Sequence, residues 1–236
     1  MSTFNDKVVV VTGAAGGLGQ SIVAHFRDAG AKVGLIDYSD ELLQKAFPNS
    51  DPEKEILVSC DLTNRDSTQA AFDNILSRFG AIDVLANIAG GFAMGEQVHE
   101  TSDKTWDFLL NLNTRSIVNT AAAAVPVMLK QGSGKIINVS SASSVKGSGL
   151  QGAYIASKSA VARLSETMAD ELRAKNINVN YIMPSIIDTP VNRQSMPDAD
   201  FSKWVKPTDL ANVVTFLASD ASVAVHGAGI PVVGLS

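Results

Sequence analysis

Residues 7–30 read KVVVVTGAAGGLGQSIVAHFRDAG and contain three successive patterns. The β-branched run at 8–11 predicts a buried strand, and the glycine cluster at 13–19 predicts a tight turn. The residues after the turn, with Ile22 and Phe26 at helical spacing, predict an amphipathic helix. Glycines let a backbone approach a pyrophosphate closely, and a helix N-terminus directs its N–H groups towards phosphates. This stretch therefore predicts an anion-binding turn, although tight turns also need glycine for steric reasons alone.

A second buried strand is predicted at 32–37 and ends in Asp37. This acid lies 18 residues beyond Gly19, where the second strand of a dinucleotide-binding fold delivers a carboxylate to the adenosine ribose. A carboxylate accepts hydrogen bonds from a 2'-hydroxyl and repels a 2'-phosphate, and no Lys or Arg occurs within 38–41. We therefore predict NAD(H) rather than NADP(H) as the cofactor. The alternative is that Asp37 caps a helix beginning near Ser39.

Tyr154 and Lys158 stand four residues apart near the start of another predicted helix, and Ser141 lies thirteen residues upstream of the tyrosine. Residues at i and i+4 share one helix face, so the Lys158 ammonium is expected beside the Tyr154 phenol. A neighbouring positive charge and the first turn of a helix both favour the ionised phenol, so we expect its pKa to lie below the usual value of about 10. Such a tyrosine can exchange a proton with an alcohol or carbonyl oxygen. Tyr-x-x-x-Lys alone also arises by chance in many helices.

Together these motifs resemble the short-chain dehydrogenase/reductase family, over nearly the whole chain. Residues 12–19 look like the family's Thr-Gly-x-x-x-Gly-x-Gly, and residues 87–90, Asn-Ile-Ala-Gly, look like its Asn-Asn-Ala-Gly. Residues 184–189, Pro-Ser-Ile-Ile-Asp-Thr, resemble the Pro-Gly-x-Ile-x-Thr segment that meets the nicotinamide. Ile88 in place of the second asparagine and Ser185 in place of glycine depart from the pattern, and both departures bear on cofactor affinity more than on proton transfer.

The resemblance also implies a role for each catalytic residue. Ser141, Tyr154 and Lys158 match catalytic positions, and Asn113, seven residues after Trp106, falls where the family keeps an asparagine in its proton relay. By resemblance, Tyr154 exchanges the hydroxyl proton, Lys158 lowers its pKa and holds the nicotinamide ribose, and Ser141 orients the substrate oxygen. Asn113 would link Lys158 to solvent through a water. For the cofactor, the resemblance and the strand ends together predict contacts from Gly13, Gly17, Leu18, Gly19, Asp37, Asp61, Leu62, Asn87, Ala89, Gly90, Tyr154, Lys158, Pro184, Ile187 and Thr189.

Two of these assignments have alternatives. Asp61, at the end of the third predicted strand, is also a candidate cap for a helix before Asn64. The glycine turn also fits Thr-Gly-x-x-Gly-x-x-Gly, the pattern of the longer sugar-nucleotide epimerases and dehydratases. Those enzymes need a further substrate region, and we expect the chain after Thr189 to be too short to form one.

Strands and helices are predicted to alternate along the chain. This order predicts an α/β fold, a doubly wound parallel sheet of the Rossmann type with about seven strands and helices on both faces. Ligands of such sheets bind beyond the carboxyl ends of the strands. We therefore predict a single NAD(P)-binding domain, 1–236, with a short substrate lid around 189–206. The predicted strands are 7–12, 32–37, 55–60, 82–86, 134–139, 177–183 and 229–233.

The charge and composition of the chain bear on its location and on the kinds of partner that it could bind. The net charge is -5 and the sequence has no basic stripe, and both features argue against a nucleic-acid partner. The lone Cys60 is consistent with a reducing compartment, and no apolar run reaches the roughly 18 residues of a membrane span, so we expect a cytoplasmic protein. The three histidines show no metal spacing, and no metal is expected. The alanine-rich stretch 121–129 predicts a helix-packing face and, by resemblance, a homodimer or homotetramer.

The predicted function is an NAD-dependent alcohol dehydrogenase or carbonyl reductase acting on a small-molecule secondary alcohol or ketone. The alternative is a sensor or scaffold that binds the dinucleotide without turnover, although such a protein has no need of a proton relay. Predicted pocket walls are 91–94, 143–152 and 189–204. Lys146 and Arg193 are candidate anion anchors within them, unless they are merely solvated. Candidate lid groups are Met196, Phe201 and Trp204.

Overall fold

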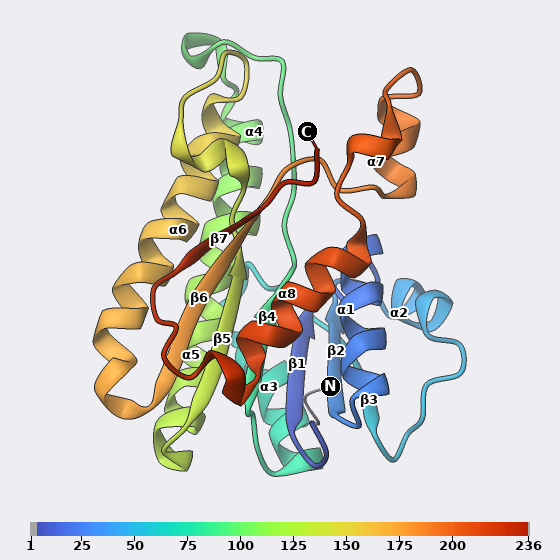
Figure 1. The fold of residues 1–236 in the computed structure, drawn as a ribbon, viewed down its shortest axis with the longest axis vertical. Helices are drawn as coiled ribbons and strands as arrows, with labels where there is room; N and C mark the ends of the chain where they lie inside the picture. The colour runs from blue at the N-terminus through green and yellow to red at the C-terminus, as the bar shows by residue number, and fades with distance from the viewer. Residues whose placement is uncertain (1–3, 236) are drawn as a thin grey trace.

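The structure is a computed structural model that describes residues 4–235. Seven parallel strands form one sheet in the order β3-β2-β1-β4-β5-β6-β7, which confirms the predicted doubly wound sheet (Figure 1). Each predicted strand is confirmed to within two residues at either end. The strands are β1 (Val8–Thr12), β2 (Lys32–Asp37), β3 (Glu55–Ser59), β4 (Val84–Asn87), β5 (Gly134–Val139), β6 (Ile177–Pro184) and β7 (Gly229–Val232).

Helices cover both faces of the sheet (Figure 1). Two separate clusters of buried apolar side chains lie between the helices and the strands, one on each face. Helices α1, α2 and α8 pack on the first cluster, and α3, α5 and α6 pack on the second. The α-helices are α1 (Gly17–Asp28), α2 (Asp40–Ala46), α3 (Arg65–Phe79), α4 (Asp103–Leu110), α5 (Ser116–Gln131), α6 (Gly152–Leu172), α7 (Pro190–Ser195) and α8 (Pro207–Ala218).

Strand β1 shows why a run of valines forms the centre of this fold. Successive side chains of a strand point to opposite faces, so a strand covered on both faces needs apolar residues at every position. Val9 and Val11 enter the cluster shared with α1 and α8, whereas Val8 and Val10 enter the cluster shared with α3 and α5. All five residues of β1 are buried.

The order of the strands reverses at β1. The chain continues from β1 to β2 on one side, and β4 pairs with β1 on the other side, with Thr12 opposite Asn87 at the carboxyl end. The segments that leave these two strands lead to helices on opposite faces of the sheet, α1 on one and α4 on the other. Such a divergence leaves a crevice at the carboxyl ends of the strands, which is where ligands bind in open α/β sheets.

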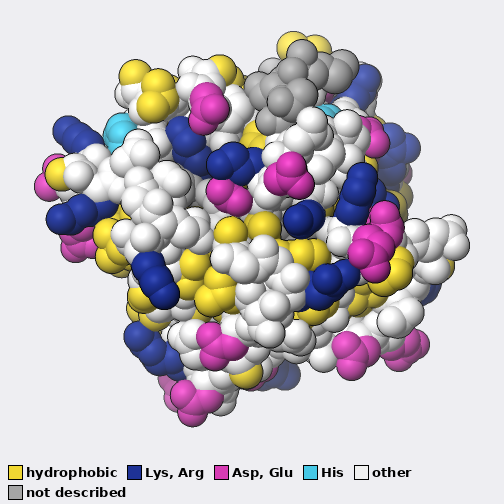
Figure 2. Space-filling view, turned by 90° about the horizontal axis from the view of Figure 1, so that it is seen from below, with side chains coloured by type: hydrophobic (Ala, Val, Ile, Leu, Met, Phe, Trp, Pro, Cys, Tyr) yellow, Lys and Arg dark blue, Asp and Glu magenta, His cyan; other side chains and the backbone are white. Residues whose placement is uncertain are grey.

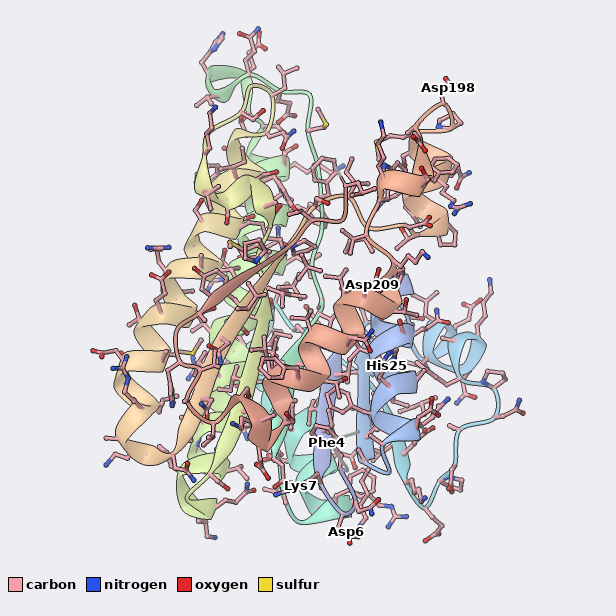
Figure 3. All side chains as sticks on the ribbon, viewed as in Figure 1. Phe4, Asp6, Lys7, His25, Asp198 and Asp209 are labelled. Carbon is pink, nitrogen blue, oxygen red and sulfur yellow. The ribbon has the colours of Figure 1, made fainter. Side chains whose placement is uncertain are left out.

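The segment 189–206 lies on the same side as the carboxyl ends of the strands. It contains α7 and a 3-10 turn (Phe201–Lys203), and a bridge between Ile187 and Val205 joins its two ends. Asp198 marks its outer tip, at the far end of the molecule from Phe4 (Figure 3).

A chain of buried polar side chains joins the middle strands to α6. The Asn87 amide donates to Asn138 Oδ1 (2.8 Å), and the Asn138 amide donates to Ser165 Oγ (2.8 Å). The Ser165 hydroxyl donates in turn to the Val161 carbonyl (2.7 Å). Asn138 is fully buried, so water cannot readily replace it as the hydrogen-bond partner of Asn87 or Ser165.

We predict that Asn138→Ala lowers the free energy of unfolding by about 2–4 kcal/mol, because it opens a small cavity and leaves the buried Asn87 amide without its acceptor. Urea unfolding followed by circular dichroism measures the change. Asn74→Ala, at an exposed position of α3, is the matched control and should be neutral or slightly stabilising. Equal effects of the two substitutions would contradict a structural role for the buried chain.

Candidate active site

Two adjoining cavities open at the carboxyl ends of the central strands. The first, of about 470 Å³, is lined by the glycine turn and by the residues that follow β2 and β3. The second, of about 590 Å³, is lined by the residues that follow β5 and β6 and by the first turns of α6. Leu18, Ile88 and Gly90 line both cavities, so the two form one continuous site across the crevice.

The glycine turn brings the ends of β1 and β4 together. Gly13 has φ of 65°, and a Cβ there would lie 2.8 Å from the backbone N and Cα of Ala89. Only glycine permits this approach. The Thr12 hydroxyl accepts hydrogen bonds from the backbone N–H groups of Ile88 (3.1 Å) and Ala89 (3.2 Å). This role of Thr12 was not predicted from the sequence, where the available signal was a hydroxyl at the end of an otherwise apolar strand.

The N-terminus of α1 fits a pyrophosphate. Its N-cap residue is Gly16, which has no side chain to satisfy the N–H groups of the first turn. Gly17, Leu18 and Gly19 of that turn line the first cavity. A Cβ at Gly17 would lie 3.1 Å from Thr189 Cγ2, so the turn meets the segment 184–189 from the other half of the sheet. Helix N–H groups and small residues at this point match what a phosphate group requires.

Two carboxylates line the first cavity, and neither caps a helix. Asp37 accepts hydrogen bonds from the backbone N–H groups of Ala15 (3.0 Å) and Tyr38 (2.9 Å), and Ser39 caps α2 instead. Asp61 accepts from both the N–H (2.9 Å) and the hydroxyl (2.7 Å) of Thr63. The alternative interpretations of both acids as helix caps are therefore wrong. The cap of α3 is Asn64, whose side chain accepts from the backbone N–H of Ser67.

No Lys or Arg lines this first cavity within residues 4–235. Its lining also includes Leu62, Ala89 and Cys60, and the Cys60 thiol is buried. Burial raises the pKa of that thiol, so it acts here as a small apolar wall. An uncharged adenosine moiety fits between apolar groups and two acids, whereas an additional phosphate would lack a cationic partner.

The second cavity holds the predicted proton-transfer residues. Tyr154 lies in the first turn of α6, and Lys158 follows one turn later on the same face. The Lys158 ammonium is buried and donates to the Val139 carbonyl at the end of β5 (2.9 Å). The Ser141 hydroxyl lies beside the Tyr154 phenol in the same cavity, and Ser141 Oγ accepts from the backbone N–H of Ser143 (3.2 Å).

Burial controls the protonation of both groups. It lowers the pKa of Lys158 to about 8, because a charged ammonium loses hydration that one carbonyl does not replace. Burial also raises the pKa of Tyr154, and the hydrogen bond from Ser141 offsets only part of this rise. The expectation that Lys158 and the helix N-terminus lower the phenol pKa is therefore wrong for the protein alone. Loss of water around the phenol is the largest effect on its pKa.

Asn113 lies beside Gly90 in a single π-helical turn, Asn111–Arg115, between α4 and α5. Its side chain accepts from the Gly91 N–H (2.8 Å), and its amide donates to the Gly91 carbonyl (3.0 Å) and to Ser157 Oγ (2.9 Å). A Cβ at Gly90 would lie 2.9 Å from Asn113 Oδ1 and 3.0 Å from Lys158 Nζ. Gly90 therefore lies against the ends of both side chains. Single π-helical turns such as Asn111–Arg115 are frequent at functional sites.

The segment 184–189 closes the far side of the second cavity. Pro184 and Ile187 line the cavity, and Thr189 caps α7 by accepting from the Asn192 N–H (3.3 Å). Ser185, one of the two departures from the family pattern, donates its hydroxyl to the Val233 carbonyl (2.8 Å) and so binds the C-terminal segment. The other departure, Ile88, packs on the apolar cluster of α1.

Apolar side chains dominate the outer walls of the second cavity. Phe92 stands edge-to-face to the Tyr154 ring, with centroids 4.8 Å apart. Residues 91–94 were predicted to form part of the pocket wall, but the contact between the two rings was not predicted. Of the three predicted lid groups, Met196 lines the cavity, whereas Trp204 is buried beneath the segment and Phe201 packs on it.

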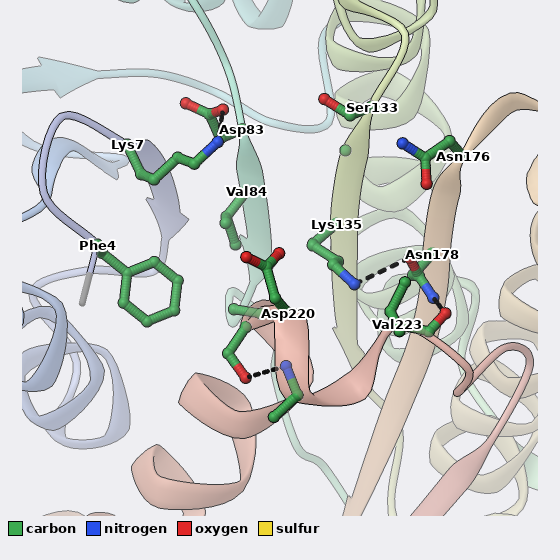
Figure 4. A pocket seen from close by; sticks show the side chains of 14 residues that line it. Phe4, Lys7, Asp83, Val84, Ser133, Lys135, Asn176, Asn178, Asp220 and Val223 are labelled. Atoms are coloured by element: carbon green, nitrogen blue, oxygen red, sulfur yellow. Dashed lines mark hydrogen bonds and ion pairs between the residues drawn. The ribbon is translucent and has the colours of Figure 1, made fainter. Parts of the chain in front are cut away.

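A separate cavity of about 430 Å³ lies at the opposite ends of the strands, near Phe4 (Figure 4). Its lysines already have partners: Lys7 pairs with Asp83 (3.0 Å), and Lys135 donates to Asn178 Oδ1 (2.9 Å). Basic and acidic side chains are interspersed over this end of the molecule (Figure 2). Residues 4–235 contain no cluster of three or more His, Cys, Asp or Glu suited to a metal ion. In that range, no helix has the length and apolarity needed to cross a bilayer.

Comparisons with known proteins agree with this geometry. Residues 7–200 match the family model described as short chain dehydrogenase. The chain is 33% identical over 231 residues to a 3-oxoacyl-(acyl-carrier-protein) reductase of Thermotoga maritima, with 94% of each chain covered. It is 34% identical over 247 residues to cyclopentanol dehydrogenase of Comamonas sp., covering 99% of this chain and 98% of the relative.

A solved structure shows the same arrangement. Carveol dehydrogenase from Mycobacterium avium, in complex with NAD, superposes with a TM-score of 0.90 at 26% identity, covering 99% of this chain and 98% of that chain. A family model that spans most of the chain, together with relatives above 30% identity over nearly its full length, establishes the relationship. The chain belongs to the short-chain dehydrogenase/reductase family of oxidoreductases.

Proposed function

We propose that the protein transfers a hydride between NAD(H) and a secondary alcohol or ketone, with Tyr154 as the proton-transferring group. One observation carries the proposal: the Tyr154 phenol, the Ser141 hydroxyl and the Lys158 ammonium lie in a cavity that is continuous with the glycine-turn cavity. When bound, a nicotinamide dinucleotide supplies the hydride chemistry. The residues of this chain bind, orient and move the proton.

Each residue of the second cavity has a distinct task in this proposal. Ser141 holds the substrate oxygen, and because Ser141 lines the same cavity as Tyr154, that oxygen comes within reach of the phenol. Tyr154 then gives its proton to the oxygen in reduction and takes a proton in oxidation. Lys158 stabilises the phenolate while its ammonium is positioned by Val139. Asn113 holds the backbone of Gly91 and so maintains the wall beside Lys158.

The direction of the pKa changes bears on the direction of the reaction. Because burial raises the Tyr154 pKa, the phenol is protonated at neutral pH and ready to donate to a carbonyl oxygen. Oxidation of an alcohol needs the phenolate and is therefore favoured at alkaline pH.

The first cavity supports NAD(H) over NADP(H). Asp37 and Asp61 line it, and none of its described lining residues is cationic. A 2'-phosphate would enter beside carboxylates with no positive charge to bind it. The similarity to a carveol dehydrogenase solved in complex with NAD also supports this choice.

We also propose a homo-oligomer. Trp106 and Phe108 on α4 and Val118 and Leu129 on α5 are large apolar side chains, each more than two-fifths exposed. Exposed apolar residues on neighbouring helices are typical of a surface covered by another subunit. Two-fold symmetry is the commonest arrangement for such contacts.

We predict that Tyr154→Phe lowers kcat by about 100-fold or more on a secondary alcohol found by screening with NAD, while NADH binding is retained, because only the proton donor is lost. Stopped-flow absorbance at 340 nm and NADH titration measure the two effects. Tyr181→Phe removes the same atom outside the cavity, where the hydroxyl donates to Glu166, and should keep its turnover. Full turnover by the Tyr154 variant would disprove the proton role.

We predict that Asp37→Ser weakens NAD binding by about 10-fold and strengthens NADP binding, because the variant loses a charged acceptor of ribose hydrogen bonds. Calorimetric titration of both cofactors measures the change. Asp37→Asn is the matched comparison, since its amide oxygen can still accept from the Ala15 N–H without the charge. Tighter binding of NADP than of NAD by the unmodified protein would overturn the assignment.

We predict that Lys158→Met raises the melting temperature of the cofactor-free protein while abolishing turnover. The native protein binds this proton with a pKa of about 8 and the unfolded chain with a pKa of about 10.5, so a buried charge destabilises the fold below pH 8. The stability of the unmodified protein should recover between these values as the pH rises. The advantage of the variant should therefore be largest near pH 7 and shrink towards pH 10; the opposite trend would contradict the burial effect.

A further inference from the structure

We propose that the substrate of this site is an uncharged, compact and largely apolar alcohol or ketone, and that Phe92 is the wall against which its carbon skeleton packs. This inference rests on the proposed function and narrows it from secondary alcohols in general to one chemical class. It follows from the apolar side chains of the cavity wall, from the charges around the cavity and from the small number of polar side chains that could bind further substrate oxygens.

The cavity wall collects exposed apolar side chains from three separate segments. Phe92 and Met94 come from the loop after β4, Ile186 from the segment after β6, and Met196 from the end of α7. Each is at least 36% exposed, although all four line the same cavity. Large apolar side chains gathered around one concave site lose water only when a ligand covers them, which favours an apolar ligand.

Phe92 lies closest to the chemistry among these residues. Its ring meets the Tyr154 ring nearly at right angles, at 81°, with centroids 4.8 Å apart. A substrate whose oxygen reaches the Tyr154 hydroxyl must therefore place its adjoining carbons beside Phe92. An aromatic wall at this position stabilises rings and branched alkyl groups through contact area.

The charges around the cavity do not favour an anion. Lys158 is the one charged residue among the described lining residues, and it is already bound to the Val139 carbonyl. Arg193 forms two hydrogen bonds with Asp188 (2.5 and 2.8 Å) and lies over the Phe201 ring, 4.7 Å from its centroid. Lys146 is exposed and does not line the cavity. A carboxylate or phosphate that entered here would lose hydration without gaining a dedicated partner.

The polar groups of the wall do not match a polyol either. Asn192 donates its amide to the Ile187 carbonyl (2.8 Å), and Ser141 belongs to the proton-transfer group. Ser140 and Ser185 donate their hydroxyls to the carbonyls of Lys158 and Val233. Gln151 and Ser143 are the other uncharged polar side chains in the described lining that could bind further substrate oxygens. A sugar with a hydroxyl on every carbon needs more partners than this, because each unpaired buried hydroxyl costs binding energy.

The cavity also limits the size of the substrate. Its volume of about 590 Å³ is bounded in part by Ile88, Gly90, Pro184 and Ile187, which are predicted to meet the cofactor or adjoin residues that do. The substrate therefore occupies only the outer part, between Phe92 and Met196.

The test compares ketones of one skeleton that differ in charge. Cyclohexanone and 4-oxocyclohexanecarboxylate are reduced with NADH under identical conditions, alongside a ketose and a short 3-oxoacyl thioester of coenzyme A, which is large and carries phosphates. We expect kcat/KM for cyclohexanone to exceed that for the carboxylate by about 100-fold or more, since the carboxylate is desolvated without a partner. Calorimetric binding of each compound to the protein–NADH complex should give the same order.

Two lysine substitutions, one within α7 and one at the residue that follows it, test the reason for this preference. Met196→Lys places a cation at the cavity wall and should reduce the ratio between cyclohexanone and the carboxylate by about 10-fold or more. Val191→Lys adds the same charge at an exposed position that does not line the cavity, and should leave the ratio unchanged. Phe92→Ala should lower kcat/KM for cyclohexanone by about 10-fold and change that for acetone little, because acetone has few carbons to pack on the ring.

The outcomes separate this inference from the function on which it rests. Turnover of the carboxylate, the ketose or the thioester at least as fast as that of cyclohexanone would overturn the substrate class and leave the oxidoreductase assignment intact. Equal effects of Met196→Lys and Val191→Lys would show that the cavity wall does not set the preference, and would overturn the inference as well. If NADH binds but no ketone of any class is reduced, the proposed function itself is wrong.

Discussion

The close approach between the ends of β1 and β4 is the constraint on which the rest of the site depends. Gly13 lies against Ala89 at a distance that excludes any side chain, and the Thr12 hydroxyl holds two N–H groups of the neighbouring segment. Because the strand order reverses here, the chain leaves the two strands towards opposite faces. The crevice that results is the place where the N-terminus of α1 and the cavity of Tyr154 share a boundary.

Burial does more than shape this site. It lowers the pKa of Lys158 to about 8 and raises that of Tyr154, so the two groups tend towards their neutral forms in the protein alone. An ion pair between ammonium and phenolate would form only when something compensates the lost hydration. Ser141 favours the phenolate and lowers its pKa in part, and the Val139 carbonyl accepts a hydrogen bond from the Lys158 ammonium.

Much of the fold was predictable from the sequence because its signals are local. A short stretch of sequence was enough to predict the buried strand from the valines of β1 and the tight turn from the glycines after them. The acid at the end of β2 could likewise be placed at a strand end from the sequence nearby. The motif at Tyr154 and Lys158 likewise fixes a shared helix face. What escaped prediction depends on residues distant in the chain: the direction of the Tyr154 pKa follows from the burial of the assembled cavity. The edge-to-face contact of Phe92 and the bond from Ser185 to the C-terminal segment are equally non-local.

The side chains that line the continuous site differ from one end to the other. The proposed cofactor and the proposed substrate both follow from this difference. Two carboxylates at one end disfavour an extra phosphate on the adenosine side. A single buried cation, Lys158, lies near the middle, and apolar side chains surround the other end. A dinucleotide carries its negative charge in the pyrophosphate, and the helix N-terminus with the small residues Gly16 and Gly17 would suit that charge in the proposed binding mode. Cationic side chains are therefore needed at neither end of the site. Lys146 and Arg193 do not line the second cavity, which is consistent with the uncharged substrate that we propose.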